Sequence, residues 1–533
     1  LAQIQSVGFD ALLAEHREAW ARRWADAEVV IEGSPEDEFA ARFSVFHLLS
    51  NTADNEEAAV GARGLSGNAY GGHVFWDADV FVLPVLVAIR PAAARAMLEY
   101  RIHRLPAARA AAEAQGLKGA RFPWESAADG SDVTPRWIRG KQGQLIPIRT
   151  GQREEHVVAD VAWAAARYAT WTGDRSFVTG VGRDLLVDTA RYWSSRIRMD
   201  AEGRGHLYGV IGPDEDHAVV DDNAFTNVMA RWNLRQGAEL LSEAGDNEEA
   251  ERWRGLADAL IDGWNPERGI YEQFAGYFDL EPLLVSQVAP PPTVGINVLL
   301  GAERVAGSQI IKQADVLMLH HLVPEEVMPG SLAPCLAFYE PRTAHGSSLS
   351  PAVHASLFAR AGEPQRALEL FRLAARLDLD DVTGTTAGGL HLGAMGGTWQ
   401  ALAYGFLGLR ADAGARLGDD SLRYSACRAR RSRDARALQP TWAHFHDRIA
   451  QQQEEQSIST IIATLDATAA ARPVLETALR IGELTGADVE AIHVTDGAID
   501  TPESLAQRSG VPFRALNGVG CQNPFGHAAR RYS

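Results

Sequence analysis

Helical periodicity fills most of this chain, from residue 7 to about residue 410, with little strand-like alternation. Apolar residues recur with a period near 3.6, the spacing that places them on one buried face of a helix. The segments follow one another in loose pairs, which predicts an all-α toroid of helical hairpins rather than a bundle. The expected helices cover residues 7–26, 37–53, 78–89, 91–115, 154–173, 176–197, 223–244, 247–264, 296–307, 310–321, 346–361, 365–377 and 397–409.

Polar and aromatic residues gather in the connections between these helices. If inner and outer helices alternate around a barrel, every second connection lies at the same end, and the side chains there share one cleft. The connections concerned are residues 68–79, 119–135, 204–223, 339–350 and 383–398.

Charge and cysteine content exclude several classes of function. The net charge of −18 argues against a nucleic-acid or anionic-membrane partner. The longest apolar run, residues 80–87, is too short to span a bilayer. Cys335, Cys427 and Cys521 are too scattered for a disulfide framework or a metal-type pair. With no signal-like start, the chain is expected in the cytoplasm, without a bound metal.

The pattern changes after residue 409. A segment rich in Ala, Arg and Asp is followed by a strand at 460–466, an amphipathic helix at 470–485 and a second strand at 489–494. A crossover of this length predicts a parallel strand–helix–strand unit. The expected divisions are a helical linker with the first barrel helices at 1–60, the barrel at 61–410, a linker at 411–456, the α/β fragment at 457–516 and a disordered tail at 517–533.

An acidic turn is the first candidate for catalysis. The Gly-Pro pair at 212–213 breaks helical structure, so that Asp214 and Glu215 are expected on a loop. Helical periodicity resumes at residue 224, with Asp222 or Asn223 as the predicted N-cap. A carboxyl group on a rigid turn just before a helix suits a general acid, although an ordinary acidic turn has the same composition.

Two loops combine aromatic rings with carboxylates, as carbohydrate sites do. Tyr70, Trp76 and Asp77 lie in one of them, and Trp124 and Glu125 in the other. An aromatic ring can face the C–H side of a sugar, while carboxylates accept hydrogen bonds from its hydroxyls. The alternative is a buried aromatic anchor with Asp77 as a helix cap.

Lys312 and Gln313 are expected where a helix begins and offer donors to sugar hydroxyls.

A different set of residues suits an inorganic anion. Hydroxyls, imidazoles and glycines precede two later helices, and helix N-termini with such neighbours hold anions. Helix capping and close helix packing are the alternatives. The residues concerned are His345, Ser347, Ser348, His391, Gly396 and Gly397.

Five of these segments, in this order, resemble glycoside hydrolase family 65, which contains the maltose, trehalose and kojibiose phosphorylases and their hydrolase relatives. The resemblance covers residues 60–410 and implies an (α/α)6 barrel, in agreement with the expected helices. The segments are Phe75-Trp76-Asp77, Gly212-Pro213-Asp214-Glu215, Lys312-Gln313-Ala314-Asp315-Val316, His345-Gly346-Ser347-Ser348-Leu349-Ser350 and Gly393-Ala394-Met395-Gly396-Gly397-Thr398-Trp399.

The resemblance also implies roles. Glu215 matches the general acid, and Trp76, Asp77, Lys312 and Gln313 match positions that hold the donor glucosyl ring. Phosphate attacks C1 of an α-glucoside with inversion, so that β-glucose 1-phosphate and a free sugar are formed. Inorganic phosphate is the co-substrate, and no other cofactor is implied. The matching phosphate-site residues are Ser347, Ser348 and His391, with His345, Gly396 and Gly397 nearby.

Phosphorolysis is favoured over hydrolysis by what the chain offers near residues 345–350. An inverting hydrolase needs a second carboxylate as base, about 6.5–9.5 Å from the acid. Phosphate is already an anionic nucleophile, and this segment holds His, Gly and Ser instead. A phosphate dianion would also help Glu215 to keep its proton. Glu340, a few residues upstream, is the alternative base.

Two departures from the family qualify this interpretation. Its full-length members carry an N-terminal β-sandwich domain that contributes to acceptor binding and dimer contacts, and this chain begins about where the following linker would. Residues 457–516 resemble the first half of a universal stress protein domain, with Asp466 at the adenine-contacting position. The glycine-rich phosphate loop of that fold is absent, so ATP binding is not expected.

Three hypotheses therefore stay open at this point. The first is an inverting disaccharide phosphorylase, with an α-glucoside and phosphate as its small-molecule partners and a homodimer as its assembly. The second is an inverting α-glucosidase such as a trehalase. The third is an inactive truncated barrel that acts through its C-terminal fragment in regulation.

Overall fold

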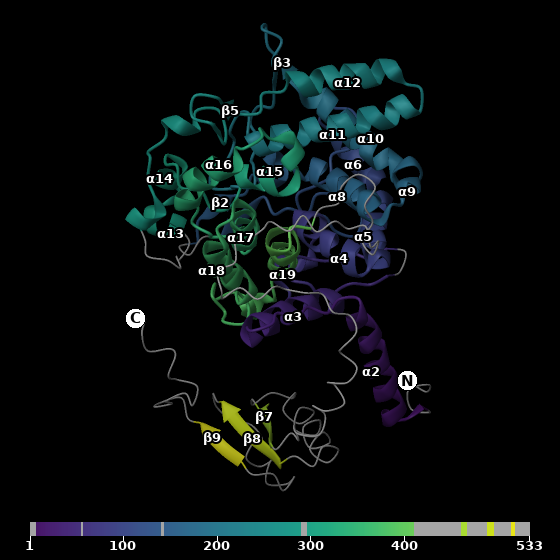
Figure 1. Ribbon diagram of the computed structural model, residues 1–533, viewed down its shortest axis with the longest axis vertical. Coiled ribbons are helices and arrows are strands. Elements are labelled where there is room, and N and C mark those ends of the chain that lie inside the picture. Colours follow the sequence, from purple (N-terminus) through teal and green to yellow (C-terminus); the bar gives the residue numbers. More distant parts are fainter. Residues whose placement is uncertain are drawn as a thin grey trace. The chain divides into compact units, whose positions relative to one another are not determined.

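The computed structural model describes residues 7–54, 57–139, 143–288 and 296–409, together with three strands near the C-terminus. The chain divides into two compact units, Leu1–Leu438 and Gln439–Ser533, and Figure 1 draws both. The first unit is helical, and the second contains the three strands.

Most of the helical unit consists of helices between 4 and 20 residues long. They are α2 (Phe9–Ala25), α3 (Pro35–Ser50), α4 (Leu83–Ile89), α5 (Pro91–His103), α6 (Leu105–Glu113), α7 (Thr150–Arg153), α8 (Val157–Thr172), α9 (Arg175–Thr179), α10 (Arg183–Arg196), α11 (Ala224–Glu243), α12 (Asn247–Ala259), α13 (Ile296–Leu300), α14 (Ala302–Ala306), α15 (Val316–Leu322), α16 (Leu332–Tyr339), α17 (Ser350–Ala361), α18 (Pro364–Ala375) and α19 (Leu392–Gln400). Two π-helical segments, η2 (Asp77–Val82) and η8 (Ala401–Phe406), adjoin α4 and α19.

Six of the described helices form a closed inner ring. In order around it, α4 contacts α8, α8 contacts α11, α11 contacts α15, α15 contacts α17, α17 contacts α19, and α19 returns to α4. Each inner helix also contacts an outer one: α5, α10, α12, α16, α18 and α3, respectively. This alternation confirms the toroid of helical hairpins that the periodicity predicted and the (α/α)6 barrel that the resemblance implied, and closure of the ring is the part that periodicity could not show.

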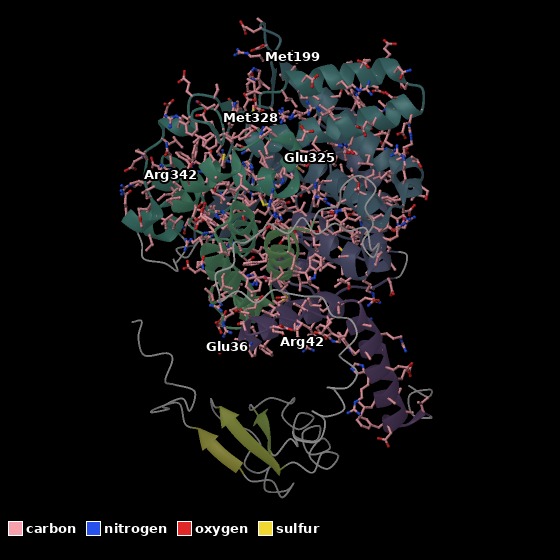
Figure 2. All side chains as sticks on the ribbon, in the orientation of Figure 1. Glu36, Arg42, Met199, Glu325, Met328 and Arg342 are labelled. Atoms are coloured by element: carbon pink, nitrogen blue, oxygen red, sulfur yellow. The ribbon has the colours of Figure 1, made fainter. Side chains whose placement is uncertain are left out.

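The inner helices are apolar around most of their circumference because they are buried. Val157, Val161 and Ala165 of α8 are completely buried, as are Phe225 and Val228 of α11. A helix enclosed by a ring on one side and an outer partner on the other has little surface left for water. Figure 2 shows the side chains throughout this unit.

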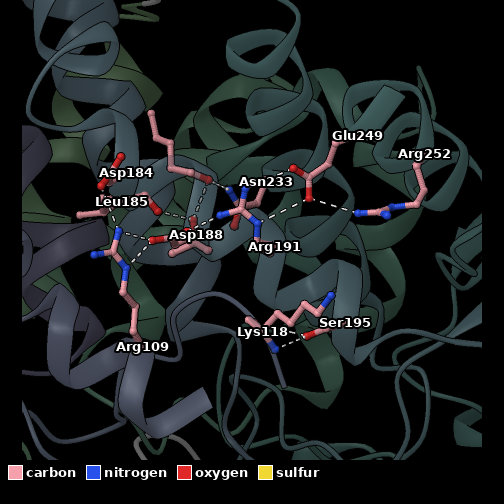
Figure 3. A network of polar contacts seen from close by, with 12 residues as sticks. Arg109, Lys118, Asp184, Leu185, Asp188, Arg191, Ser195, Asn233, Glu249 and Arg252 are labelled. Carbon is pink, nitrogen blue, oxygen red and sulfur yellow. Dashed lines mark hydrogen bonds and ion pairs between the residues drawn. The ribbon is translucent and has the colours of Figure 1, made fainter. Parts of the chain in front are cut away.

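Ion pairs on the outer layer join helices that are separated in sequence. Asp188 of α10 accepts from Arg109 of α6 at 2.6 Å and from Arg191 of α10 at 2.6 Å, and Arg191 also contacts Glu249 of α12 (Figure 3). Arg372 of α18 contacts Asp37 of α3 through two hydrogen bonds of 2.7–2.8 Å. The second contact helps to join the two ends of the ring.

Several elements differ from the sequence prediction. The helix predicted for 310–321 begins only at Val316, because residues 308–311 are extended and form parallel bridges from Ser308 to Glu281 and from Ile311 to Thr343. Lys312 and Gln313 therefore precede the helix instead of beginning it. Three antiparallel two-stranded pairs and helix α16 were not predicted. The strand pairs are β1 (Trp137–Arg139) with β2 (Leu145–Pro147), β3 (Arg198–Met199) with β4 (Gly205–His206), and β5 (Trp264–Asn265) with β6 (Ile270–Tyr271).

The second unit contains a parallel sheet in the order β7 (Thr460–Leu465), β8 (Asp488–Val494) and β9 (Phe513–Leu516). The predicted parallel pairing of the first two strands is confirmed, and β9 is an additional strand. The predicted linker at 411–456, the helix at 470–485, Asp466 and the tail at 517–533 lie outside the described residues. No described helix has the length and apolar character needed to cross a membrane.

Candidate active site

Several candidate residues precede helices of the inner ring in the sequence. Asp77 and η2 precede α4, Glu215 precedes α11, and Lys312 precedes α15. Ser347 and Ser348 precede α17, and His391 is the N-cap residue of α19. The contacts described below join these segments to one another, so the structure brings together most of the residues singled out in the sequence.

The loop that carries Glu215, residues 212–217, is fixed by the buried side chain of Asp214. Its Oδ1 accepts the backbone N–H of Lys312 at 2.8 Å, and its Oδ2 contacts His217 Nδ1 at 2.6 Å and Gln273 Nε2 at 2.9 Å. Both carboxylate oxygens are thus used inside the protein. Asp214 therefore holds the loop, and the partly exposed Glu215 is the carboxylate that the loop presents.

Helix α11 begins as predicted from the sequence. Asn223 is its N-cap, and the side-chain Oδ1 accepts from the backbone N–H of Thr226 at 2.9 Å. The same side chain donates to Asp315 Oδ1 at 3.1 Å. One residue thus caps the helix and links the acid loop to the segment that contains Lys312.

Lys312 is the closest charged partner of the candidate acid. Its Nζ lies 2.8 Å from Glu215 Oε1, and both side chains are about 30 % exposed. Burial alone would lower the pKa of this ammonium, but the charge of Glu215 and the hydrogen bond outweigh it, so that the pKa of Lys312 is raised above its usual value. The two partly exposed groups form an ion pair.

Gln313 has a different position from the one predicted. It is 3 % exposed, and its Nε2 donates to the carbonyl of Pro213. This hydrogen bond supports the acid loop from inside the protein. Gln313 therefore helps to hold the acid loop, and its contact with a sugar stays a prediction.

Trp76 and Asp77 belong to a segment far from Glu215 in the sequence, but the fold brings them to the same site. Asp77 begins the π-helical turn η2, an element that is frequent at functional sites. Burial and the negative charge of Glu215 raise the pKa of Asp77 to about 6. Trp76 is buried, and its ring meets that of His156 edge to face at 4.9 Å between centroids.

The second aromatic loop adjoins the first. Phe75 and Trp124 meet edge to face at 5.8 Å, and Glu125 Oε2 contacts His73 Nδ1 at 2.8 Å. Burial raises the pKa of Glu125, although His73 opposes the effect. Trp124 and Glu125 are thus largely buried beside the predicted donor site. Tyr70, by contrast, is 56 % exposed and has a left-handed backbone, with φ 60°.

The segment 345–350, called here the serine segment, is joined to Lys312 through the main chain. The N–H of Gly346 donates to the carbonyl of Lys312 at 2.9 Å. Ser350 Oγ accepts from the N–H of Ala314 at 3.2 Å and lies 3.1 Å from His345 Nδ1. His345 also has a left-handed backbone, with φ 49°, a costly conformation for a residue other than glycine.

His391 is held in a fixed orientation by Asp378. Both its backbone N–H and its Nδ1 contact the Asp378 carboxylate, at 2.8 and 2.7 Å, and Thr385 Oγ1 lies 3.3 Å from its Nε2. Burial raises the pKa of Asp378, but the hydrogen bonds and charge of His391 outweigh it, so that this pKa is below its usual value.

Close contacts join the serine segment, α19 and Asp77. A Cβ atom added at Gly393 would lie 2.5 Å from Leu349 Cδ2 and 2.9 Å from Asp77 Oδ1. The N-terminal ends of α17 and α19 therefore lie close together, and the donor-site carboxylate lies beside both. Converging helix N-termini create a region of positive potential that suits an anion.

Gly396 and Gly397 do not fit their predicted place in phosphate binding. Both lie inside α19 and are buried. A Cβ at Gly396 would lie 2.4 Å from the carbonyl oxygen of Phe81, and one at Gly397 would lie 2.8 Å from Ala352 Cβ. Their small size lets α19 approach η2 and α17 closely, which is helix packing and not anion contact.

One buried acidic group near the site was not predicted. Glu154 is 1 % exposed, and its Oε1 lies 3.4 Å from His156 Nε2, while His156 Nδ1 contacts Asp160 at 2.6 Å. Burial and the charge of Glu215 raise the pKa of Glu154 well above its usual value. Burial would lower the pKa of His156, but Asp160 and Glu154 raise it to about 10. The sequence signal that could have indicated this group is a helix start with His156 and Asp160 about one turn apart.

Both carboxylate oxygens of Glu340, the alternative base, have side-chain partners. Its Oε1 accepts from Arg366 at 2.7 Å, and its Oε2 contacts His354. Burial would raise the pKa of this carboxyl, but His354 and His345 outweigh it and hold the pKa far below the usual value. Such a carboxylate is a weak base.

Comparison with known proteins shows which family has this architecture. The family described as the glycosyl hydrolase family 65 central catalytic domain matches residues 42–400. A kojibiose phosphorylase of Caldanaerobacter subterraneus subsp. tengcongensis is 37 % identical over 434 residues, covering 77 % of this chain and 56 % of that protein. The Escherichia coli kojibiose phosphorylase is 36 % identical over 410 residues, covering 75 % and 54 %.

A solved structure agrees with these sequence matches. The chain of a proposed kojibiose phosphorylase from the human microbiome superposes with a TM-score of 0.68 at 26 % identity, covering 76 % of this chain and 60 % of that one. The present chain thus spans slightly more than half the length of the curated relatives it matches. The family match extends over most of the closed helical ring and includes every segment of the candidate site. The chain belongs to glycosyl hydrolase family 65.

Proposed function

We propose that this chain catalyses the inverting phosphorolysis of an α-glucosyl disaccharide, releasing β-glucose 1-phosphate and a free sugar. The observation that carries the proposal is the double contact of Lys312. Its Nζ contacts Glu215, and its carbonyl accepts from Gly346 of the serine segment. A proton donor and a segment suited to an anion are thereby held next to each other.

The proposed reaction needs one proton donor and one nucleophile. A phosphate oxygen attacks C1 of the glucosyl ring from the face opposite the leaving group, and the bond from C1 to the glycosidic oxygen breaks. Glu215 gives its proton to that oxygen, so that the second sugar leaves as an alcohol. One displacement at C1 inverts its configuration and converts the α-glucoside into a β-phosphate.

Hydrolysis would need a carboxylate that activates water, and neither Glu340 nor Glu154 suits that role. Glu340 is bound by Arg366 and His354. Glu154 is 1 % exposed and has a raised pKa, which disfavours the ionised form that a base requires. Phosphate needs no such base, which supports phosphorolysis.

The substrate is proposed to be kojibiose or a related α-glucosyl disaccharide, because kojibiose phosphorylases are among the relatives. The test supplies kojibiose, maltose, trehalose and nigerose with and without phosphate and measures glucose 1-phosphate and its anomeric configuration. Phosphate-dependent formation of the β-anomer supports the proposal. Release of glucose at the same rate without phosphate would identify a hydrolase instead.

A further inference from the structure

Two histidines and a glutamate lie together around the start of the serine segment. Glu340 begins the short helix η6 (Glu340–Arg342), which directly follows α16, while His345 begins the serine segment and His354 lies on α17. One possible ligand atom from each of these three side chains lies within 4.8 Å of the other two. Cysteine spacing predicted no metal site, but imidazoles and carboxylates also bind metals.

The Oε2 atom of Glu340 is the common neighbour of both histidines. His345 Nε2 lies 3.7 Å from this oxygen, and His354 Nδ1 contacts it directly. Bonds of about 2.0–2.1 Å in a tetrahedral arrangement place two ligand atoms about 3.3 Å apart around Zn²⁺. The separation at His345 is close to this value, whereas the contact at His354 has to open slightly. A bound ion replaces the hydrogen bond between His354 and Glu340, and the proton of that bond passes to water.

The imidazole of His345 has the hydrogen bonding of a metal ligand. Its Nδ1 lies 3.1 Å from Ser350 Oγ, whereas its Nε2 is buried without a hydrogen-bond partner among the described residues. A histidine that binds a metal through one ring nitrogen uses the other in a hydrogen bond, which fixes the orientation of the ring. The nitrogen that lies near Glu340 is thus the one without a hydrogen bond.

The carboxylate of Glu340 is oriented from its other side. Arg366 donates to Oε1 at 2.7 Å, which leaves Oε2 directed at the histidines. Arg366 also pairs with Glu369 at 2.7 Å, and this second carboxylate offsets its charge towards an incoming cation. The side chains of Glu340 and His345 are 11 and 15 % exposed, whereas that of His354 is completely buried. An ion can therefore enter beside Glu340 and His345.

We propose that Glu340, His345 and His354 form a binding site for a divalent transition-metal ion, with Zn²⁺ as the best-suited ion. Imidazole ligands favour such ions over Mg²⁺ and Ca²⁺, which prefer oxygen ligands. Three protein ligands leave the fourth tetrahedral position to water. The ion joins the end of α16, the serine segment and α17, so that it holds the serine segment in one position. This site goes beyond phosphorolysis and does not depend on it.

The first test measures metal binding by the 533-residue chain, without an activity assay. The unmodified chain, His354→Gln and His345→Gln are treated with a chelator, dialysed against micromolar Zn²⁺ and analysed for zinc. The unmodified chain should hold one zinc ion more than either variant. Zn²⁺ should also raise its unfolding temperature by several degrees more than that of the variants, because the ion binds only the folded site. Equal zinc contents, or equal rises in unfolding temperature, would overturn the proposal.

His320 provides a matched control. It lies on α15, is 2 % exposed and has an Nε2 without a hydrogen-bond partner, but it lies outside the group of three. His320→Gln should keep both the additional zinc ion and the full rise in unfolding temperature. The same losses in this variant would show that removal of any buried histidine has these effects, and the proposal would then fail.

Cobalt keeps the test decisive if the histidine variants do not fold. Co²⁺ can replace Zn²⁺ at such a site, and its visible absorption is much stronger in four-coordinate than in six-coordinate geometry. The unmodified chain should give the strong bands, without the near-ultraviolet band that a thiolate ligand such as Cys335 would add. Weak six-coordinate bands alone, or strong bands accompanied by the thiolate band, would contradict a site of two histidines and a glutamate.

Discussion

Lys312 Nζ lies 2.8 Å from Glu215 Oε1 although the two residues are 97 positions apart in the chain. The contact is possible because extended residues before α15 run beside the acid loop, where Asp214 accepts the N–H of Lys312. One lysine thus contacts the proposed acid with its side chain and the serine segment with its carbonyl. The site is therefore built from loops that hold each other in place.

Glu215→Gln should lower phosphorolysis of a disaccharide by about 100- to 10,000-fold, the usual contribution of a general acid. The amide keeps the size of the side chain but has no acidic proton to transfer. The measurement is the initial rate of glucose 1-phosphate formation. The control substrate is α-glucosyl fluoride, whose leaving group needs much less protonation, and on this substrate the variant should keep most of its activity. An equal loss on both substrates would contradict the assignment.

Ser348→Ala should raise the KM for phosphate about tenfold, as expected for loss of a hydrogen bond to a charged ligand. The KM for the disaccharide should change little, because the role proposed for Ser348 is to bind phosphate, whereas other residues are proposed to hold the sugar. Ser347→Ala serves for comparison, since Ser347 Oγ also accepts from the N–H of Leu349 at 3.3 Å and its loss loosens the segment. A larger effect on the disaccharide than on phosphate would refute the anion role of Ser348.

The sequence predicted the positions of the loops better than the contacts between them. Asn223 could be recognised as a helix cap because its hydrogen bond is local. Lys312 was placed at a helix start because the apolar residues around it fit a helical period as well as a buried extended segment. Glu154 was missed because the charge of Glu215, which helps to raise its pKa, belongs to a residue 61 positions away, and no local pattern records such a proximity.

Gly396→Ala should destabilise the helical unit by about 1–3 kcal/mol or more, because its Cβ would lie 2.4 Å from the backbone oxygen of Phe81. Gly255 of α12 is the matched control, since a Cβ there meets nothing within 4 Å. Gly255→Ala should stabilise by about 0.5–1 kcal/mol through the better helix propensity of alanine. Thermal or denaturant unfolding measures both. Unchanged stability in Gly396→Ala with a raised KM for phosphate would restore the anion role.

The pH dependence of stability should reflect the buried carboxyl groups beside the site. Burial and the charge of Asp214 raise the pKa of Asp315 to about 7, and burial raises the pKa of Asp216 to about 6. A raised carboxyl pKa stabilises the folded state below the unfolded pKa of about 4, and this stabilisation is lost as the pH rises through about 7.

Asp315→Asn removes one of these groups. The difference in unfolding temperature, variant minus unmodified chain, should therefore become more positive between pH 4 and pH 8. Asp279→Asn, at an exposed position, should give a difference that does not vary with pH. A constant or falling difference for Asp315→Asn would show that Asp315 does not hold its proton in the folded chain.

The contact between Asp77 and Gly393 has a consequence for synthesis of the chain. These residues are 316 positions apart, and the helix after Asp77, α4, is a direct neighbour of α19, which contains Gly393, in the closed ring. Until α19 leaves the ribosome, α4 and α17 lack one of their ring neighbours and expose the apolar side chains that α19 would cover. A nascent chain of this family therefore depends on protection from aggregation until its last helix has been translated.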